Sequence, residues 1–384
     1  MPAAHISQSV ESFPIRRIPT AELDRLPFVS VIVPVRNEAG ALGRTLDCLR
    51  AQDYPYGRME IIVADGMSTD CTRRIVSLAA AIDPRIRLID NSSRIMAAGF
   101  NLALQIARGD VIIMMGGHTE LATDYLQNCV FLLQQGVADC VGGPITTTSE
   151  TPEAEAISLA MSSRFGVGGV AFRVGCRQRK YVDTVPFGAY TREILNRAGP
   201  LDEELVRGQD SEFNYRLRKL GGKILIAPEI RSRYQCRSSL PSLGRQYFQY
   251  GKSKVRILQK HPRQMQWRHF VPAAFVCSLL LSLGIALVRP FVGVPLLLVL
   301  SVPYLVAMFA VSLSLAVRRG KWRLVPALAM AFPILHFSYG GGFLLGLAKF
   351  RNCWHGFWEA LTGKNTGSPG PPRGKPSRKE SICF

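Results

Sequence analysis

Two carboxylates follow an apolar segment near the N-terminus of the chain. Asp65 comes directly after residues 59–64, and Asp70 stands five positions further on, with a glycine, a serine and a threonine among the residues between them. An aspartate can accept paired hydrogen bonds, which suits the base or the ribose of a nucleotide. Asp70 has a second interpretation, as the N-cap of the helix that follows. The pattern therefore indicates a nucleotide-binding edge centred on Asp65.

The segments around these carboxylates alternate between two kinds of element. Short apolar runs rich in β-branched residues are separated by segments of helical periodicity. We expect strands at residues 28–35, 59–64, 85–89 and 111–115, and helices at 39–52, 70–81, 95–107 and 125–134. Continuous apolar strands between helices predict an α/β fold, a mostly parallel sheet with helices on both faces. Ligands of such sheets bind beyond the carboxyl ends of the strands, which is where Asp65 stands.

The next part of the chain is less regular. We expect a helix at residues 152–163, a loop rich in glycine and arginine at 166–180, a helix at 210–220 and a strand at 223–226. Residues 240–260 have the pattern of an amphipathic helix rich in Arg, Lys, Tyr and Phe. Such a helix suits an anionic membrane surface, and the alternative is an ordinary helix that packs on the preceding domain.

Several of these segments, in this order, resemble the glycosyltransferase family 2 enzymes. The sequence VIVPVRNE at 31–38 matches the opening strand of the family, and EIIVADGMSTDCT at 60–72 matches the second. Residues 91–101, followed by Ala107-Arg108-Gly109-Asp110, match the family's next stretch. The resemblance covers residues 29–220 and implies an α/β fold of the GT-A type that binds nucleotide sugars.

The resemblance also implies which residues contact the donor, a nucleotide-diphosphate sugar. In the family, the end of the first strand touches the nucleotide and the carboxylate at the Asp65 position binds the base, with the Asp70 position nearby. The donor-binding residues expected on this basis are Pro34, Arg36, Asn37, Glu38, Asp65, Asp70, Arg94 and Gly117.

The fourth strand is followed by Gly116-Gly117-His118, where the family usually has Asp-x-Asp or Asp-x-His. The third position of that motif binds a divalent metal, Mg or Mn, that bridges the nucleotide diphosphate, and imidazole can serve as such a ligand. We therefore expect His118 to be a metal ligand, the alternative being a loop or core histidine. The missing first carboxylate leaves open whether metal is required, and whether the chain is a non-catalytic membrane subunit that retains the fold.

Two further segments, 182–190 and 207–212, resemble the family's acceptor site and the start of its acidic helix. On this basis Asp210 is the general base of an inverting transfer, removing the proton of the acceptor hydroxyl as its oxygen attacks the anomeric carbon. The residues expected on the acceptor side are Phe187, Gly188, Gln209 and Glu212. By spacing alone, Asp210 and Glu212 could also be first-turn acids favoured by the helix dipole.

Residues 245–252, RQYFQYGK, resemble the succinoglycan-type exopolysaccharide transferases, which add single sugars to lipid-linked oligosaccharides. The Gln-x-x-Arg-Trp signature of processive polysaccharide synthases is not found in the sequence. The resemblance implies transfer of one sugar from the nucleotide-diphosphate donor to a polyprenyl-diphosphate-linked acceptor in exopolysaccharide biosynthesis. A processive polysaccharide synthase is the alternative.

The charge of the chain is unevenly distributed. The 384 residues carry a formal net charge of +19, yet residues 1–230 hold 25 basic and 26 acidic side chains, whereas residues 231–268 hold ten basic and no acidic ones. A nucleic-acid partner is therefore not expected, and the basic stretch predicts contact with an anionic membrane. Nine widely spaced cysteines without a C-x-x-C pair indicate neither a disulfide framework nor a zinc site.

Composition divides the chain into five parts. They are a polar N-terminal extension (1–27), a catalytic domain (28–230), a basic juxtamembrane segment (231–270), a membrane region (271–348) and a basic tail (349–384) that we expect to be disordered.

Three segments of the membrane region, 271–288, 291–317 and 324–348, are long and apolar enough to cross a bilayer as helices. The first two predict a hairpin, and the basic residues 318–323 after it are expected on the cytoplasmic side. Three crossings would place the basic tail outside; alternatively the third segment re-enters, with a bend at Gly340-Gly341-Gly342. Because residues 1–27 lack the pattern of a signal peptide, we expect a multi-pass protein of the bacterial inner (cytoplasmic) membrane whose catalytic domain faces the cytoplasm.

Overall fold

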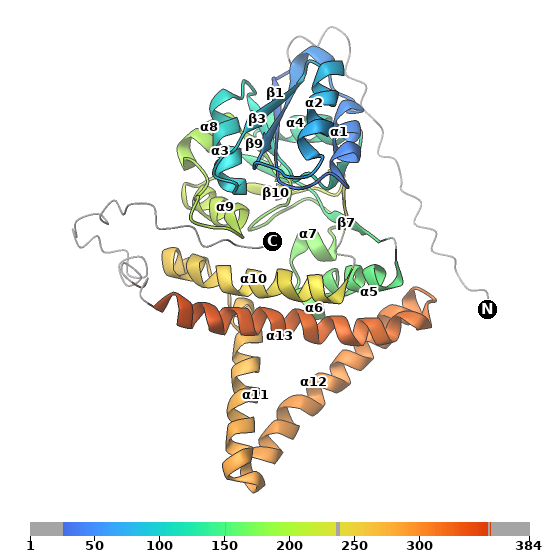
Figure 1. The fold of residues 1–384 in the computed structure, drawn as a ribbon, viewed down its shortest axis with the longest axis vertical. Helices are drawn as coiled ribbons and strands as arrows, with labels where there is room; N and C mark the ends of the chain where they lie inside the picture. Colours follow the sequence, from blue (N-terminus) through green and yellow to red (C-terminus); the bar gives the residue numbers. More distant parts are fainter. Residues whose placement is uncertain (1–25, 150, 236–238, 352–353, 355–384) are drawn as a thin grey trace.

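The computed structural model describes residues 26–149, 151–235, 239–351 and 354 of the chain. The expected N-terminal extension and basic tail therefore lie almost wholly outside the described residues. Figure 1 shows an α/β domain, a platform of helices beneath it, and a helical hairpin that projects from the platform.

The α/β domain is built on an eight-stranded sheet. In spatial order its strands are β3 (Ile86–Asp90), β2 (Met59–Asp65), β1 (Val29–Val35), β4 (Val111–Met114), β9 (Ala189–Thr191), β6 (Cys140–Gly142), β10 (Ile224–Ile226) and β8 (Lys180–Tyr181). β1 is parallel to β2 and β4, β2 to β3, and β6 to β10, while β9 and β8 are antiparallel to their neighbours. The predicted mostly parallel sheet is thus confirmed, and the antiparallel insertion of β9 is a feature that the apolar pattern did not indicate.

A second, three-stranded sheet has the order β5 (Thr119–Leu121), β11 (Ser232–Gln235) and β7 (Ile145–Thr148). It was not predicted, since its strands are short and polar. The helices of the α/β domain are α1 (Leu42–Arg50), α2 (Thr72–Ile82), α3 (Met96–Ile106), α4 (Tyr125–Gln134), α8 (Arg192–Ala198) and α9 (Gln209–Lys219), with a 3₁₀ turn η2 (Tyr56–Arg58) before β2. The helix expected at 210–220 is α9.

The two faces of the large sheet form separate apolar cores, which explains why the strands are apolar throughout. On β1, Val31 and Val33 pack in a core covered by α1, α2 and α4. Ile32 between them packs in a second core with residues of α3, α8 and α9. Each of these three side chains is fully buried, and burial of one such side chain contributes about 1.5–3 kcal/mol. Helices therefore cover both faces, as predicted.

The platform consists of α5 (Pro152–Met161), α6 (Arg164–Val167), α7 (Ala171–Val174), α10 (Leu240–Lys260) and α13 (Val325–Lys349). The expected loop at 166–180 thus contains short helical turns. α10 has the predicted bounds, and it lies between the α/β domain and α13 instead of on the outer surface of the platform (Figure 1). Lys260 contacts Asp202 at 2.5 Å and Arg256 contacts Glu204 at 3.2 Å. Two of the basic residues assigned to a membrane surface therefore bind the α/β domain.

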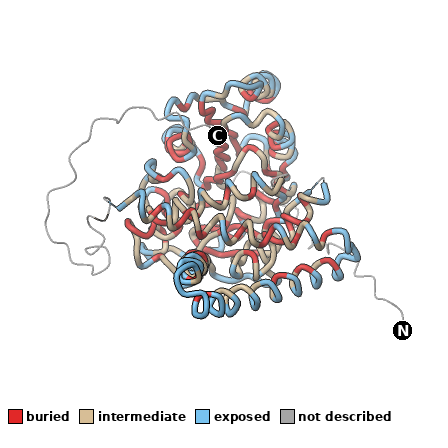
Figure 2. Tube along the Cα trace, turned by 60° about the horizontal axis from the view of Figure 1, so that its bottom comes forward, coloured by how far each residue is buried: buried red, intermediate tan, exposed pale blue. Residues whose placement is uncertain are grey.

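The hairpin consists of α11 (Val271–Val288) and α12 (Pro290–Arg318), joined at Arg289. Three 3₁₀ turns flank it: η3 (Pro262–Gln264) and η4 (Trp267–His269) before α11, and η5 (Trp322–Leu324) after α12. Figure 2 shows much of the hairpin as exposed, although its residues are apolar. α11, α12 and the segment that contains α13 are each long and apolar enough to cross a membrane.

The predicted bend at Gly340-Gly341-Gly342 is wrong, because α13 is one continuous helix over these residues. The glycines instead allow close packing. A Cβ at Gly342 would lie 2.1 Å from the Phe248 carbonyl oxygen of α10, and one at Gly340 would lie 2.5 Å from the Pro272 carbonyl oxygen of α11. Backbone-to-backbone contact of this kind fixes α13 along α10.

Candidate active site

Four loop residues with unusual backbone angles mark one edge of the large sheet. Among the described residues, Asn37, Met67, Arg94 and Phe187 are the non-glycine residues with positive φ, at 54°, 57°, 61° and 48°. The first three follow β1, β2 and β3, and Phe187 precedes β9, whose antiparallel direction brings it to the same edge. Such backbone conformations cost energy and collect at functional sites. The edge is the one at which the donor site was predicted.

Asp65 ends β2 and is completely buried. Its Oδ2 accepts hydrogen bonds from the Ser68 amide at 3.0 Å and from Nη1 of Arg73 at 2.8 Å. Its Oδ1 is buried and has no hydrogen-bond partner among the described residues. A buried acceptor without a donor is costly, and the N–H of a nucleotide base would supply one. Nη1 of Arg73 also contacts Asp90 at 2.8 Å, and its side chain is 39% exposed.

Asn37 and Asp70 hold the first two loops of this edge together. Asn37 accepts a hydrogen bond from the Thr69 amide at 2.9 Å, and Asp70 accepts one from the Ala39 amide at 3.1 Å and another from the Thr72 amide at 3.0 Å. Burial raises the pKa of Asp70, but these hydrogen bonds, with that of the Thr72 hydroxyl, outweigh it and lower the pKa overall. The contacts of both side chains indicate that they position the loops, and their predicted contact with the donor stays a prediction.

The loops after β1 and β4 bring Glu38 and His118 together. Oε1 of Glu38 lies 3.0 Å from Nδ1 of His118, and the two side chains are 27% and 30% exposed. Gly117 permits this approach, because a Cβ there would lie 2.8 Å from Val35 and 3.3 Å from Glu38. The pair combines a carboxylate with an imidazole at an accessible position. Pro34 lies in β1 and Arg36 directly after it, both half-buried, and Arg94 is exposed beyond β3.

Glu38 and His118 are the side chains that could serve as ligands of a metal ion at this edge. Within the described ranges, no group of three or more His, Cys, Asp or Glu side chains could hold a metal. One carboxylate and one imidazole suit Mn²⁺ or Mg²⁺ when phosphate oxygens and water supply the other ligands, as is common for Mg²⁺. Glu38 and His118 would therefore fit a divalent cation whose other ligands come from phosphate and water, with Glu38 in place of the carboxylate that Gly116 lacks.

A cation that the sequence did not single out lies next to this pair. The Tyr234 ring contacts the His118 ring edge-on at 5.2 Å, and the guanidinium of Arg173 on α7 lies 5.8 Å from the same Tyr234 ring. Nη1 of Arg173 is buried and lacks a hydrogen-bond partner among the described residues. The sequence places Arg173 in the loop rich in glycine and arginine, but nothing there distinguishes it from the other arginines of that loop as a site residue.

The predicted acceptor side is formed by β9 and the start of α9. The Phe187 carbonyl accepts a hydrogen bond from the Tyr125 hydroxyl at 2.7 Å, and the Gly188 carbonyl accepts one from the Met114 amide at 3.1 Å. Gln209 is buried and donates to the Val206 carbonyl at 2.9 Å. These contacts join parts of the chain to one another and so orient the backbone at this edge. The acceptor-side roles of these residues stay predictions.

Asp210 lies in the first turn of α9, after Gly208 with φ 80°. It is half-buried, and no described residue donates a hydrogen bond to it. The Gln264 side chain on η3 donates to the Ser211 carbonyl at 2.7 Å, which fixes this turn against the juxtamembrane segment. A carboxylate held by its backbone but without a partner suits a general base.

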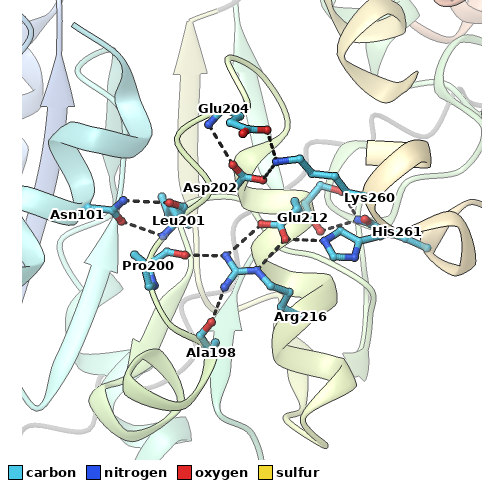
Figure 3. A network of polar contacts seen from close by, with 12 residues as sticks. Asn101, Ala198, Pro200, Leu201, Asp202, Glu204, Glu212, Arg216, Lys260 and His261 are labelled. Carbon is cyan, nitrogen blue, oxygen red and sulfur yellow. Dashed lines mark hydrogen bonds and ion pairs between the residues drawn. The ribbon is translucent and has the colours of Figure 1, made fainter. Parts of the chain in front are cut away.

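Glu212 differs from Asp210 in this respect (Figure 3). It is 1% exposed, and its Oε1 contacts Arg216 at 2.7 Å and Nε2 of His261 at 2.9 Å. Burial raises the pKa of Glu212, but the hydrogen bonds from His261 and Arg216 outweigh it and lower the pKa overall. With the Lys260–Asp202 pair, Glu212 joins the end of α10 to α9. Its contacts thus indicate positioning of Asp210, and contact with an acceptor stays a prediction.

An α/β domain with this edge, followed by helices that could enter a membrane, is the arrangement expected from the resemblance to glycosyltransferases. Residues 30–197 match the sequence profile of Glycosyl transferase family 2. The predicted resemblance to the family 2 glycosyltransferases is therefore confirmed over this domain.

Two curated relatives match most of the chain. It is 29% identical over 334 residues to dolichyl N-acetyl-alpha-D-glucosaminyl phosphate 3-beta-D-2,3-diacetamido-2,3-dideoxy-beta-D-glucuronosyltransferase of Methanococcus voltae, which covers 84% of this chain and 98% of that protein. It is 28% identical over 330 residues to the succinoglycan biosynthesis protein ExoA of Rhizobium meliloti (strain 1021), which covers 84% of this chain and 95% of that protein. The predicted similarity to succinoglycan-type transferases is confirmed.

Among solved structures, the mannosyltransferase PcManGT from Pyrobaculum calidifontis, in complex with GDP-Man and Mn²⁺, has a similar fold. The TM-score is 0.53 at 20% identity, over 83% of this chain and 87% of that one. This similarity confirms the GT-A type of fold.

Proposed function

We propose that the protein transfers a single sugar, with inversion, from a nucleotide-diphosphate donor to a polyprenyl-diphosphate-linked acceptor in exopolysaccharide biosynthesis. One observation carries this proposal: Asp210 is an unpartnered carboxylate at the junction between the donor edge and the juxtamembrane segment. An acceptor held at a membrane surface would reach the base at this junction. The names of the two curated relatives, one acting on a dolichyl phosphate sugar and one in succinoglycan biosynthesis, support a lipid-linked or exopolysaccharide substrate.

In this mechanism the Asp210 carboxylate accepts the proton of the acceptor hydroxyl. The oxygen attacks the anomeric carbon from the face opposite the diphosphate, the bond to the diphosphate breaks, and the nucleoside diphosphate leaves with the electron pair. Asp65 holds the base through its unpaired Oδ1, and the Arg173 guanidinium stabilises the charge on the leaving diphosphate. A divalent cation bound by Glu38 and His118 would supply further charge neutralisation there. An α-linked donor would give a β product.

The membrane arrangement is part of the proposal. α11 and α12 cross the cytoplasmic membrane as a hairpin, with Arg289 at its far end, and α13 lies along the membrane surface without crossing. α13 is held to parts of the chain outside the hairpin at three points. Lys321, just before it, contacts Glu155 of α5 at 2.8 Å, His336 in its middle contacts the Phe165 carbonyl of α6 at 3.0 Å, and the Phe350 carbonyl at its end accepts from Gln259 of α10 at 2.8 Å.

These contacts limit where α13 can go. α10 carries five basic residues, and its two ends are bound to the α/β domain and α5, so it cannot enter the bilayer core. A helix of 25 residues is about 37 Å long, so a crossing α13 would leave α10 after the first turns. Since α13 instead packs on α10 along its length, both ends of α13 lie on the side of the catalytic domain. The basic loop at 318–323 then faces the cytoplasm, as the sequence predicts.

Cysteine labelling tests this arrangement. In a background without native cysteines, R289C should react with a membrane-impermeant maleimide in intact cells, whereas W322C and K349C should react only after permeabilisation. Reaction of K349C in intact cells would show that α13 crosses the membrane.

A donor screen tests the activity. Membranes that contain the protein are incubated with radiolabelled nucleotide sugars, and the label that enters the lipid fraction is measured and sized. We expect one donor to give a product one sugar longer, and D210N to lower the rate by about 10²- to 10⁴-fold while nucleotide binding persists. A polymer ladder would identify a processive synthase instead, and near-normal turnover by D210N would refute the assignment of the base.

A further inference from the structure

Lys254, Arg268 and His269 lie close to one another, and Lys254 lies next to the Asp210 carboxylate. Lys254 belongs to α10, and Arg268 and His269 belong to η4, the turn that leads into α11. Lys254 lies near Asp210 and Arg268: burial lowers the pKa of Lys254 to about 8, Asp210 opposes this shift and Arg268 adds to it. Burial, followed by Lys254 and then Arg268, lowers the pKa of His269 to about 3. The three groups therefore share one electropositive space beside the base.

The two positive charges in this space are matched only in part by acids, since Asp210 acts on Lys254 and Asp183 lies near Arg268. No described residue forms a hydrogen bond or an ion pair with Lys254. Arg268 lies 3.9 Å from Asp183, but Asp183 is bound more closely by Arg218 at 3.0 Å and also accepts a hydrogen bond from Gln266. Nε of Arg268 is buried and has no partner among the described residues. Unmatched cations of limited exposure are costly unless a ligand supplies the opposite charge.

His269 adds a neutral donor to the two cations. Its Nδ1 accepts a hydrogen bond from the Gln266 amide at 3.1 Å, so the ring proton is on Nε2. Because its pKa is about 3, the ring stays neutral at physiological pH. The space therefore offers an ammonium, a guanidinium and an imidazole N–H, which are the donors that phosphate oxygens accept.

The position of these donors relates them to a lipid. Trp267, Phe270 and Val271 stand next to them in the chain and are 79%, 38% and 47% exposed. Exposed aromatic residues at the start of an apolar helix are typical of the depth of the lipid headgroups. A phosphate in this space would thus have Asp210 on one side and the apolar surface of α11 on the other. The Glu38–His118 pair, where the donor diphosphate is expected, lies at the ends of β1 and β4.

We propose that Lys254, Arg268 and the Nε2 proton of His269 bind the diphosphate of a lipid-linked acceptor and thereby present its sugar hydroxyl to Asp210. The inference rests on the proposed function, since it assumes a lipid-linked acceptor. The chain of the lipid lies along α11, and the diphosphate adds negative charge to that which Asp210 and Asp183 supply. Contact with ordinary bilayer phosphates would use the same chemistry and is separated from this proposal by the test.

The test measures binding without any transfer. Farnesyl diphosphate is titrated into the full chain in detergent, and UDP in a separate titration. Farnesyl diphosphate should bind more tightly than inorganic diphosphate or farnesol. K254M and R268Q should each weaken farnesyl diphosphate binding by about 10- to 100-fold and leave UDP binding unchanged, because each removes a charged hydrogen-bond donor. K254R should restore most of the affinity. R263Q is the matched control: Arg263 is exposed on η3, and this variant should behave as the wild type.

Three results would overturn the inference. The first is that both variants bind farnesyl diphosphate as tightly as the wild type does. The second is that they lose UDP binding in parallel. The third is that phosphatidylglycerol displaces bound, labelled farnesyl diphosphate as effectively as unlabelled farnesyl diphosphate does. The last would mean that the site binds bilayer phosphates. None of these results depends on turnover, so they are distinguishable from failure of the proposed function, which the donor screen would show as absence of transfer by the wild type.

Discussion

Glu38 and His118 form a carboxylate–imidazole pair, with Oε1 and Nδ1 3.0 Å apart although 80 positions separate the residues in the chain. The motif at Gly116-Gly117-His118 lacks the acid that family 2 enzymes usually have there. The pair shows that an acid from another strand lies beside the histidine. It makes a metal-assisted enzyme chemically reasonable despite the altered motif.

The first prediction concerns this pair. If Glu38 and His118 share a divalent cation with the donor, H118A and E38Q should each weaken the Mn²⁺-dependent part of UDP binding by about 10-fold or more, and chelation should do the same to the wild type. UDP binding without metal should change little in H118A. The measurement is a UDP titration with and without Mn²⁺. Identical titrations in both conditions for the wild type would show that metal has no part in UDP binding.

The sequence predicted much of the donor edge, for physical reasons. Apolar runs buried on both faces are recognisable without knowledge of their partners, and residues that follow parallel strands must meet at one edge. Asp65 and Asn37 were therefore placed correctly at that edge. β9 was not predicted because its three residues are set by pairing with β4 and β6, which lie far away in the chain.

The residues around Asp210 were harder to predict. Lys254 and Arg268 are two of ten basic residues in one stretch, and nothing in their spacing distinguishes them from Arg256, which binds Glu204. Which of these basic residues bind acids of the α/β domain depends on how α10 and η4 pack on it, which the spacing does not show. The length of an apolar segment likewise does not show whether the helix crosses a membrane or lies along its surface. For α13 we infer the second arrangement from its contacts with α10.

The second prediction concerns the link between α9 and α10. E212Q removes the charge that Arg216 and His261 share in a buried setting, and we expect a loss of about 2 kcal/mol or more, which lowers the apparent Tm by about 4 °C or more. The matched control is E193Q, because Glu193 and Arg197 form an i,i+4 pair at 3.8 Å whose side chains are exposed. Such a pair contributes about 0–1 kcal/mol. Thermal unfolding in detergent measures both.

The pH dependence of this link has a definite sign. The folded-state pKa of Glu212 is lowered, so its stabilisation is present above the ordinary carboxyl pKa and is lost as the pH falls through the lowered value. The difference in Tm between wild type and E212Q should therefore shrink in acid. A difference that grows as the pH falls would contradict the ion-pair network shown in Figure 3.

The third prediction concerns the contact between α10 and α13. In G342A the new methyl group would lie 2.1 Å from the Phe248 carbonyl oxygen, so the helices must separate, at a cost of about 1–3 kcal/mol. In G341A the nearest atom is Cε2 of Phe248 at 3.9 Å, an ordinary contact. Both changes gain the same helix propensity, so the pair isolates the packing effect. G342A should unfold at lower temperature and transfer sugar more slowly, and G341A should match the wild type or exceed it in stability. Equal stability of the two variants would show that the helices do not pack as described.

The last prediction concerns Lys254 and pH. Its neighbours are Asp210 on α9 and Arg268 and His269 on η4, and burial is the main cause that lowers its pKa to about 8. Lys254 is charged below this value and loses its charge as the pH rises through it. If the charged form binds the acceptor diphosphate, the Kd for farnesyl diphosphate should rise about 10-fold between about pH 7 and pH 9, in inverse proportion to the charged fraction of Lys254. In K254R the guanidinium stays charged over this range, so the Kd should be nearly constant.

His269 is neutral throughout this pH range and contributes nothing to the pH dependence of the Kd. A rise in Kd that persists unchanged in K254R would assign the titration to another group and remove Lys254 from the acceptor site.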